Sequence, residues 1–297
     1  MDSNVNYFKQ IYEELEANIK KFNILLIPEK EVEKKKPHIG EGSFGKVYKG
    51  TYAGKAVAIK KLKLDQDANA FDIINEINSV RLCDHKKIPK FYGVWKNSKN
   101  YFNLVFEFIP GVTVDKCLTN LKEEEKYKII LEICEVLMDI HKLKLIHRDL
   151  KPGNIMIDKK KDGTPTAYLI DFGTSKIASH TVSQTQTQSG TVAYMAPENF
   201  CVNVNSDNEG SIDISAKFDV WSMGCLICFI LAGVKPWNGK QDSFVINNIS
   251  SHRKYPIPKT IPGEIAEVLK LCFIYNPKDR ISSAELYEKL KVAFEKK

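Results

Sequence analysis

The chain of 297 residues lacks any apolar run close to the roughly 18 residues that a membrane-spanning helix requires, and it shows no signal peptide. We therefore expect no membrane insertion. The same absences predict an intracellular, cytoplasmic location, with the nucleus as an alternative compartment.

Paired cysteine motifs are also scarce. Of seven scattered cysteines, only Cys225 and Cys228 have the C-x-x-C spacing of many zinc sites, and neither a second pair nor a nearby histidine accompanies them. They lie in the apolar run 223–231, where this spacing on a buried helix indicates core packing. The odd number of cysteines favours a reducing compartment, so we expect no disulfides.

The formal net charge of +7 is modest for this length. Lysine runs at 34–36 and 159–161 are predicted at surface turns, and no aromatic residues are interleaved with them. This pattern is typical of solvated lysines and not of a surface that binds nucleic acid or membrane.

The stretch LIHRDLKPGN at 145–154, followed by DFG at 171–173, carries the most chemistry. Asp149 supplies a carboxylate that can accept a hydroxyl proton and orient the attacking oxygen. Asn154 and Asp171 supply hard oxygen ligands that suit Mg²⁺, and Lys151 supplies a cation for the transferring phosphate. Phosphoryl transfer depends mainly on positioning and charge neutralisation, so the set predicts a phosphoryl-transfer site.

A glycine-rich segment, IGEGSFGKV, occupies residues 39–47. Its glycine spacing also occurs in dinucleotide-binding folds, but the alternating, β-branched residues 47–52 and 56–60 favour paired strands over a following helix. We predict a hairpin over phosphates, whose glycines let the backbone approach the oxygens. The predicted nucleotide contacts of this segment are Ile39, Gly40, Gly42, Ser43, Phe44, Gly45 and Val47.

These motifs, with Lys60 in VAIK, resemble the eukaryotic protein kinases from about Lys36 to Arg280. The resemblance implies an α+β, bilobal protein-kinase fold, with a small antiparallel β lobe carrying one main helix and a larger, mostly helical lobe around a cleft. It divides the chain into an N-terminal helical extension (1–35), a small lobe (36–108) and a large lobe (109–297). It also implies ATP with Mg²⁺ or Mn²⁺ as cofactors, and protein substrates as partners.

The resemblance assigns further roles. Lys60 would pair with the α- and β-phosphates and with Glu76, on the helix predicted over 70–82. Segment 105–109 resembles the inter-lobe hinge, so backbone groups of Glu107 and Ile109 would hydrogen-bond adenine and Phe106 would be the gatekeeper. The remaining assignments are Val47, Ala58 and Met156 around the adenine ring, Asp149, Lys151, Asn154, Lys60 and Glu76 in catalysis, and Asn154 and Asp171 at the metal.

Other matches concern the large lobe. Segment 190–198 resembles the end of an activation segment, 219–224 the start of a buried central helix, and Arg280 the ion-pair partner of Glu198. We expect a last amphipathic helix over 282–294. The long, polar connection 201–217 departs from the family pattern and is predicted to be a surface insertion, and Val112 stands where a second hinge glycine is common.

Outside the motifs, apolar residues at 5, 8, 12, 15, 19 and 22 mark one face of a helix. Packing of this face on the small lobe is the expected arrangement, and a partner or dimer contact is the alternative. Ile24 to Ile27, closed by Pro28, predicts an added strand.

Lys151 and the pair Gly190-Thr191 resemble serine/threonine kinases, and segments 194–198 and 219–224 resemble the tyrosine-kinase-like branch of these enzymes. Hydroxyl residues between 175 and 189 predict activation by phosphorylation of this loop. The alternatives are a pseudokinase scaffold or signalling adaptor, and a dual-specificity or tyrosine kinase. Because Gly153 and Thr113 replace the acidic residues that read upstream arginine in some kinases, with Asp115 close by, we expect no strong preference for basic substrates.

Overall fold

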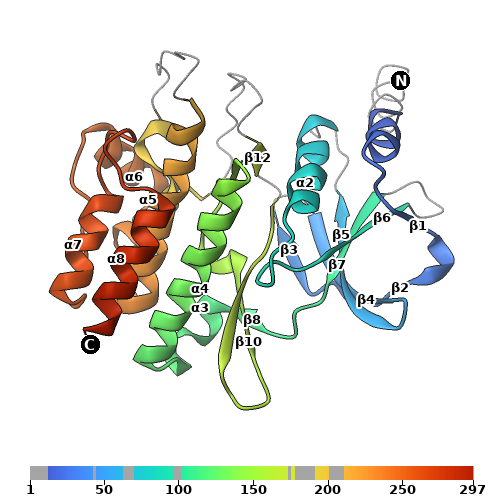
Figure 1. Cartoon of the computed structure of the whole chain (residues 1–297), viewed down its shortest axis with the longest axis horizontal. Helices are drawn as coiled ribbons and strands as arrows, with labels where there is room; N and C mark the ends of the chain where they lie inside the picture. Colours follow the sequence, from blue (N-terminus) through green and yellow to red (C-terminus); the bar gives the residue numbers. More distant parts are fainter. Residues whose placement is uncertain are drawn as a thin grey trace. The chain divides into compact units, whose positions relative to one another are not determined.

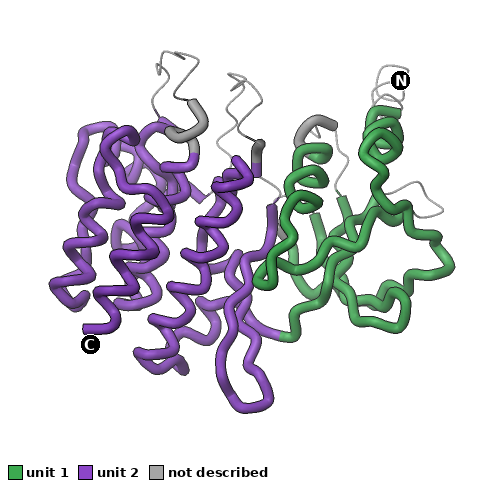
Figure 2. The backbone as a smooth tube through the Cα atoms, in the orientation of Figure 1, with its two compact units in different colours: residues 1–110 green, residues 111–297 purple. Residues whose placement is uncertain are grey.

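The computed structural model describes residues 13–42, 45–62, 70–96, 102–172, 175–177, 191–200 and 211–296. Within these ranges the side chains of 42, 70–72, 176–177 and 211–215 are not described. The chain forms two compact units, residues 1–110 (unit 1) and 111–297 (unit 2), coloured green and purple in Figure 2.

A mostly antiparallel sheet dominates unit 1 (Figure 1). Its strand order is β1, β6, β7, β5, β4, β2, and β3 pairs with β4. The strands are β1 (Leu26–Ile27), β2 (Val32–Lys34), β3 (Gly40–Gly42), β4 (Gly45–Tyr52), β5 (Lys55–Leu62), β6 (Phe91–Lys96) and β7 (Phe102–Glu107).

The main helix of unit 1, α2 (Ala70–Leu82), has the bounds expected from the sequence. It places Ile73 and Ile77 in an apolar cluster with sheet residues such as Leu62 and Leu104. The other face of the sheet buries a second cluster, which contains Ile27, Val32, Val57, Ile59, Trp95 and Val105.

Residues 13–21 are helical, and this helix ends where Asn23 adopts a left-handed conformation (φ 51°). Leu15 and Ile19 are buried in the cluster that also contains Ile73 and Ile77. The predicted packing on the chain's own sheet and helix is therefore confirmed for these residues. Residues 1–12 lie outside the described part, and no observation supports the alternative dimer contact.

The strand predicted over Ile24 to Ile27 is confirmed in a shorter form. β1 contains only Leu26 and Ile27, and it pairs in parallel with Val94 and Trp95 of β6. The preceding residue also joins the sheet, because the Val94 backbone N–H donates to the Leu25 carbonyl at 2.9 Å. The N-terminal residues thus extend the sheet of unit 1.

Helices make up most of unit 2 (Figure 1). They are α3 (Val114–Cys117), α4 (Glu123–Lys142), α5 (Ser211–Ala232), α6 (Asp242–Ser250), α7 (Gly263–Cys272) and α8 (Ser283–Glu295). Short 3₁₀ turns, such as η3 (Pro152–Asn154) and η5 (Pro197–Asn199), lie in the connections. The last amphipathic helix expected over 282–294 is confirmed as α8, which Ser282 caps.

Small sheets hold the loops of unit 2. β8 (Val112–Thr113) and β11 (Pro165–Leu169) both pair with β10 (Ile155–Lys159). β9 (Leu145–Ile146) pairs with β12 (Lys176–Ile177). These pairs bring the residues before His147 next to those that follow Asp171.

The central helix differs from the sequence-based prediction at its start. α5 begins at Ser211, earlier than the expected Asp219, so residues 211–217 belong to a helix and not to a surface connection; residues 201–210 lie outside the described part. Cys225 and Cys228 are buried in α5, which confirms their core role. Their burial raises the pKa of both thiols, that of Cys228 to about 12.

The predicted solvated lysines at 34–36 include exposed Lys35 and Lys36, whereas Lys34 is partly buried. Its ammonium lies 4.7 Å from the centroid of the Tyr48 ring and 5.3 Å from that of Trp95. Burial first, and then the nearby charges of Lys61 and Lys36, lower the pKa of Lys34.

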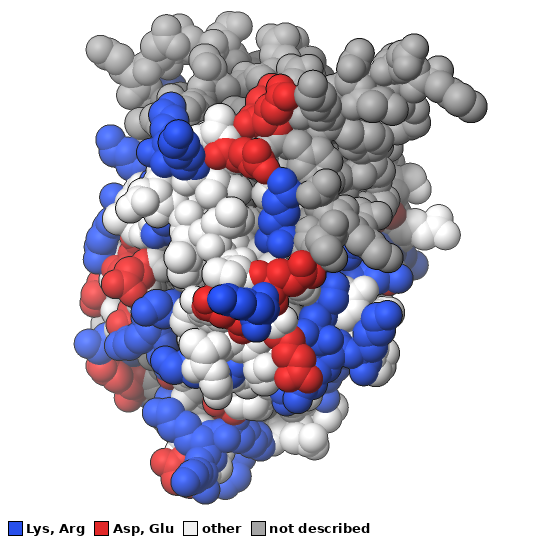
Figure 3. Space-filling model, turned by 90° about the vertical axis from the view of Figure 1, so that its right-hand side faces the viewer, with Lys and Arg blue, Asp and Glu red and all other residues white. Residues whose placement is uncertain are grey.

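Figure 3, which views the side at the right of Figure 1, shows basic and acidic side chains intermixed around a neutral area. Among the described residues, none of the helices is long and apolar enough to cross a membrane.

Candidate active site

Asp149 occupies the loop between β9 and β10 and is only 8% exposed. Its Oδ2 accepts hydrogen bonds from Lys151 Nζ at 2.6 Å and from Asn154 Nδ2 at 3.0 Å. Its Oδ1 accepts from the Thr191 backbone N–H at 3.3 Å. A carboxylate offers about four lone-pair sites, so these three bonds fix the group and leave acceptor capacity on Oδ1.

The orientation of the Asn154 amide is fixed from the same loop. Its Nδ2 donates to the Asp149 carbonyl at 2.7 Å as well as to Oδ2, so both amide hydrogens are used and Oδ1 faces away from Asp149. The Asn154 carbonyl accepts from the Ile170 backbone N–H at 2.9 Å, which brings the residue before Asp171 to this loop. An amide oxygen and a carboxylate in adjacent segments fit a hard cation such as Mg²⁺.

Asp219 of α5 holds the backbone of the loop between β9 and β10. Its carboxylate accepts the backbone N–H groups of His147 at 2.7 Å and Arg148 at 2.8 Å. It also lies 2.9 Å from His141 Nε2 of α4. Burial alone would raise the pKa of Asp219, but the hydrogen bond and charge of His141 together hold this pKa below its usual value.

The sequence interpretation used Asp219 only to place a helix, so its contact with the loop was missed. The sequence did contain a signal for this contact, since Asp219 directly precedes a strongly apolar run. An acidic residue that is buried with such a run requires hydrogen-bond or ionic partners.

Two residues of the site have strained backbones. Arg148 has φ 68° and Asp171 has φ 65°, in the left-handed region that non-glycine residues rarely adopt. Such conformations cluster at functional sites, where surrounding contacts maintain them. In this loop the Arg148 N–H bond to Asp219 provides such a contact.

His147 packs beneath the site and is fully buried. Its ring makes an edge contact with Phe172, with centroids 5.0 Å apart, and its Nδ1 accepts the Asp149 backbone N–H at 3.3 Å. Burial lowers the pKa of His147, outweighing the opposite effect of the neighbouring carboxylates. The imidazole is therefore neutral and serves as an acceptor.

In unit 1, Lys60 of β5 and Glu76 of α2 form an ion pair with Nζ and Oε1 2.5 Å apart. Both side chains are buried, at 8% and 2% exposure. The pairing expected from the sequence is thus present. It fixes the ammonium on the sheet and links it to one side of α2.

The predicted glycine hairpin forms from β3 and β4, with Gly40 opposite Val47 and Gly42 opposite Gly45. A β-carbon added at Gly40 would meet nothing within 4 Å, so open space lies beside it. The Ile39 backbone N–H donates to the Val47 carbonyl at 2.8 Å, although the Ile39 side chain is 55% exposed. Ser43 and Phe44 lie outside the described residues.

Strand register gathers other predicted nucleotide contacts on one face of the sheet. Val47 lies opposite Lys60, and Ala58 lies opposite Phe106. Opposite residues of an antiparallel pair share a face, as do positions two apart on β5. Val47, Ala58 and Phe106 are only partly buried, so they provide apolar surface for a flat ring beside the Lys60 ammonium.

The remaining predicted contacts lie at the end of unit 1 and in unit 2. The Glu107 backbone N–H donates to the Lys90 carbonyl at 2.8 Å, and Ile109 is buried. Met156, on β10 opposite Thr113, is partly buried. Among the described residues, no group of three or more His, Cys, Asp or Glu side chains could hold a metal.

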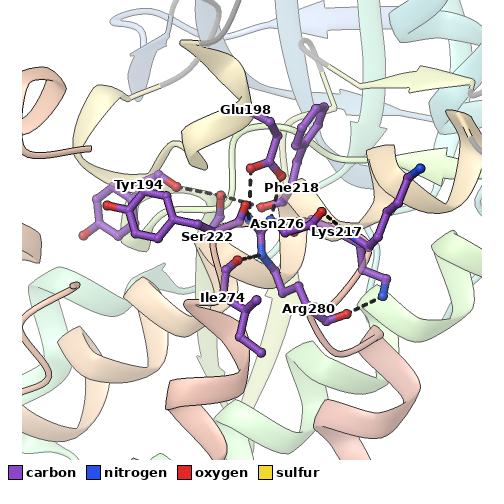
Figure 4. Close-up of polar contacts among 10 residues, drawn as sticks. Tyr194, Glu198, Lys217, Phe218, Ser222, Ile274, Asn276 and Arg280 are labelled. Carbon is purple, nitrogen blue, oxygen red and sulfur yellow. Dashed lines mark hydrogen bonds and ion pairs between the residues drawn. The ribbon is translucent and has the colours of Figure 1, made fainter. Parts of the chain in front are cut away.

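The predicted ion pair between Glu198 and Arg280 is confirmed. Arg280 Nη1 and Nη2 donate to the two Glu198 oxygens at 2.6 and 2.9 Å, in a bidentate arrangement. Arg280 is 1% exposed and also donates to the Ile274 carbonyl at 2.9 Å and to the Lys217 carbonyl at 2.7 Å. Figure 4 shows the guanidinium surrounded by these acceptors.

The antiparallel sheet with its lysine–glutamate pair and the helical unit with its Asp149 loop are the parts of a protein kinase catalytic domain. The protein kinase domain family matches residues 33–290, and the chain therefore belongs to that family. The α+β fold class and the resemblance stated from the sequence are thereby confirmed.

Several curated relatives carry kinase names. The chain is 30% identical to a mitogen-activated protein kinase kinase kinase of Cytospora mali, over 84% of the chain and 14% of the relative. It is 29% identical to a MAP kinase kinase kinase of Schizosaccharomyces pombe, over 84% and 23%. It is 30% identical to a probable LIM domain-containing serine/threonine-protein kinase of Dictyostelium discoideum, over 85% and 38%. The chain therefore spans well under half the length of these relatives.

Proposed function

We propose that the protein transfers the γ-phosphoryl group of ATP to serine and threonine hydroxyls of protein substrates. The observation that carries this proposal is the Asp149 carboxylate, fixed by Lys151, Asn154 and the Thr191 backbone with one acceptor site left. The serine/threonine specificity rests on Lys151 and on the printed name of the Dictyostelium relative. The family makes ATP the phosphoryl donor and requires a divalent metal, which we propose to be Mg²⁺, with Mn²⁺ as the alternative.

In the proposed reaction, Asp149 accepts the proton of the substrate hydroxyl at Oδ1 and orients its oxygen. Lys151, 2.6 Å from Oδ2, provides positive charge beside the transferring group. Asn154 and Asp171 would hold the metal ion, which when bound supplies charge neutralisation at the phosphate oxygens.

The nucleotide contacts are proposed from the same resemblance. Lys60, fixed by Glu76, would pair with the α- and β-phosphates. The backbone of the glycine segment, including Gly40, Gly42 and Gly45, would lie over the phosphate oxygens. The residues proposed around adenine are Val47, Ala58, Phe106, Glu107, Ile109 and Met156.

The test is phosphorylation of Ser- and Thr-containing peptides with Mg²⁺ and ATP. Asp149→Asn should lower kcat by a factor of about 10² or more, because general-base catalysis contributes about 10²–10⁴-fold. Asp242→Asn, the same change at an exposed residue of α6, should leave the rate unaltered. A wild-type chain that folds and binds ATP but transfers no phosphate would indicate a pseudokinase, and transfer to tyrosine alone would overturn the substrate class.

We also propose that phosphorylation of the activation segment raises activity. The candidate hydroxyls, Ser179, Thr181, Ser183, Thr185, Thr187 and Ser189, lie outside the described residues. Ser175 is unsuitable, because it is 2% exposed and its Oγ donates to the His147 carbonyl at 3.3 Å. Mass spectrometry before and after incubation with ATP tests the proposal, and full activity of an unmodified loop contradicts it.

We further propose an intracellular, cytoplasmic location. The six described cysteines are free thiols, and five of them are buried. Free buried thiols fit a reducing compartment. Imaging of the tagged chain in cells would test this.

A further inference from the structure

Building on the proposed function, we infer that Leu15 and Ile19 of the N-terminal helix (residues 13–21) are positioning residues for catalysis. They act through α2, which carries Glu76, and so through the Lys60–Glu76 ion pair. The N-terminal helix is then part of the catalytic apparatus of unit 1 and not an appended segment.

Contacts from the N-terminal segment reach α2 directly. Leu15 and Ile19 are 1% and 7% exposed and belong to one buried cluster with Ile73 and Ile77. The Arg81 guanidinium of α2 lies 5.1 Å from the centroid of the Phe22 ring. A narrow recess between the two helices is lined by Leu15, Asn18, Ile19, Ile24, Ile74, Ile77 and Asn78.

The N-terminal helix is itself anchored to the sheet. Glu16 accepts from Lys96 of β6 with Oε1 and Nζ 2.5 Å apart. Strand β1, a few residues further along the chain, pairs with β6. The N-terminal helix therefore packs against α2 while it is anchored to β6, so it can resist movement of α2.

The N-terminal helix and Lys60 contact different sides of α2. At 3.6 residues per turn, the recess-lining residues Ile77, Ile74 and Asn78 lie about 100°, 160° and 160° around the helix axis from Glu76. One side of α2 thus makes the ion pair with Lys60, while the part of its surface that begins about 100° away faces the N-terminal helix. Rotation of α2 about its axis would break the ion pair, and the N-terminal helix opposes that rotation.

Leu15 and Ile19 could have a simpler role and only add stability. In that case their truncation should affect activity no more than truncation of other buried apolar residues does. The same N-terminal region supplies Ile27 and Val32 to the second cluster, on the opposite face of the sheet from α2. Truncation of these residues removes comparable buried surface without touching α2. They provide a matched control for the loss of packing.

The experiment compares Leu15→Ala/Ile19→Ala with Ile27→Ala/Val32→Ala in the full chain. Each is measured for thermal midpoint, for kcat and KM with ATP, and for amide hydrogen exchange of residues 73–82. We expect both variants to lose stability. Only Leu15→Ala/Ile19→Ala should lower kcat at least tenfold and speed exchange in α2 at a temperature where the chain is folded.

A double-mutant cycle with Glu76→Gln tests whether the effect passes through the ion pair. If it does, Leu15→Ala/Ile19→Ala should reduce kcat by less than twofold once Glu76 is replaced. Equal losses of kcat in the two packing variants, or a tenfold loss that persists with Glu76→Gln, would overturn the inference.

Should the double alanine variant fail to fold, Ile19→Val removes one methyl group and should give a smaller loss in the same direction. The exchange measurement needs no phosphoryl transfer, so it separates the two proposals. Faster exchange in α2 without any activity in the wild type would defeat the proposed function only, while unchanged exchange with an active wild type would defeat the positioning role only.

Discussion

At the scale of single residues, the site side chains are fixed by partners from different segments. Asp149 receives bonds from Lys151, Asn154 and Thr191, and Asp219 accepts two backbone N–H groups of the loop. Such groups are held before any substrate arrives, which favours electrostatic stabilisation without reorganisation. Substitutions that keep shape but change charge therefore test the site most directly.

The buried ion pair gives the first prediction. Glu76→Gln keeps the size of the side chain but removes the charge opposite Lys60. We expect kcat to fall at least tenfold, because the ammonium loses the partner that orients it. Activity assays together with circular dichroism check this. Glu135→Gln, at a partly buried residue of α4 in unit 2, serves as the control, and an equal loss there would contradict a specific role of Glu76.

The lowered pKa of His147 gives a pH prediction. Because the folded state holds this imidazole neutral, the unfolded state binds more protons as the pH falls below 6.5, the usual value for histidine. Stability should therefore decrease below that pH, by up to about 1.4 kcal/mol per pH unit from this group.

Urea unfolding between pH 7.5 and 5.5 measures this dependence. His147→Asn retains an acceptor for the Asp149 N–H but cannot titrate in this range. The variant should be less stable at every pH, with a shallower slope than the wild type. Identical slopes for the two proteins would show that His147 is not the group responsible.

At the scale of elements, contacts between distant segments connect η5, α5 and the residues before α8. Arg280 bonds to Glu198, to the Lys217 carbonyl in the second turn of α5 and to the Ile274 carbonyl after α7. The close packing of α5 on α7 has a related basis, since a β-carbon at Gly224 would lie 2.9 Å from Cys272 Cβ. This part of unit 2 depends on a few tightly fitted positions.

Arg280→Leu should therefore be strongly destabilising. It leaves the Glu198 carboxylate buried without its partner, and breaking a buried pair in this way costs about 3–5 kcal/mol. Lys270→Leu breaks the exposed pair between Lys270 and Glu267, with side-chain exposures of 61% and 70%, and should change stability little. Denaturant unfolding measures the free energy of unfolding of both variants. Similar losses of stability in the two variants would contradict the importance of burial for the Glu198–Arg280 pair.

At the scale of the whole molecule, the kinase domain covers residues 33–290, and two positions of this domain bear on the proposed choice of substrate. Neither Gly153 nor Thr113 carries a charge, and an exposed ion pair elsewhere contributes only about 0–1 kcal/mol. We therefore expect peptide arrays to show less than about a tenfold gain, or roughly 1.4 kcal/mol, from arginine before the target.

Gly153→Glu offers a gain-of-function version of this prediction. Gly153 is exposed, and a β-carbon there would meet nothing within 4 Å, so the glutamate can be accommodated. The variant should prefer upstream arginine more than the wild type does, while Gly153→Gln should not. A strong arginine preference in the unmodified chain would indicate a different acidic site, with Asp115 the first residue to replace.

The sequence alone predicted the family and most of the local elements. Motif spacing and periodicity indicated the Asp149 loop, the glycine hairpin and helix α2. The resemblance to protein kinases implied the Lys60–Glu76 and Glu198–Arg280 pairs, which the structure contains. Periodicity likewise predicted the apolar face that includes Leu15 and Ile19.

Tertiary structure decided what depends on residues far apart in the chain. Three contacts join segments that are far apart in the sequence. They are the bonds of Asp219 to the loop at 147–148, the packing of Leu15 and Ile19 on α2, and the position of Lys34 near the rings of Tyr48 and Trp95. The early start of α5 at Ser211 was missed because Ile212, Ile214, Ala216 and Phe218 alternate with polar residues, and this period of two does not indicate a helix. Local sequence patterns fix short-range geometry, whereas these contacts depend on which buried surfaces meet after folding.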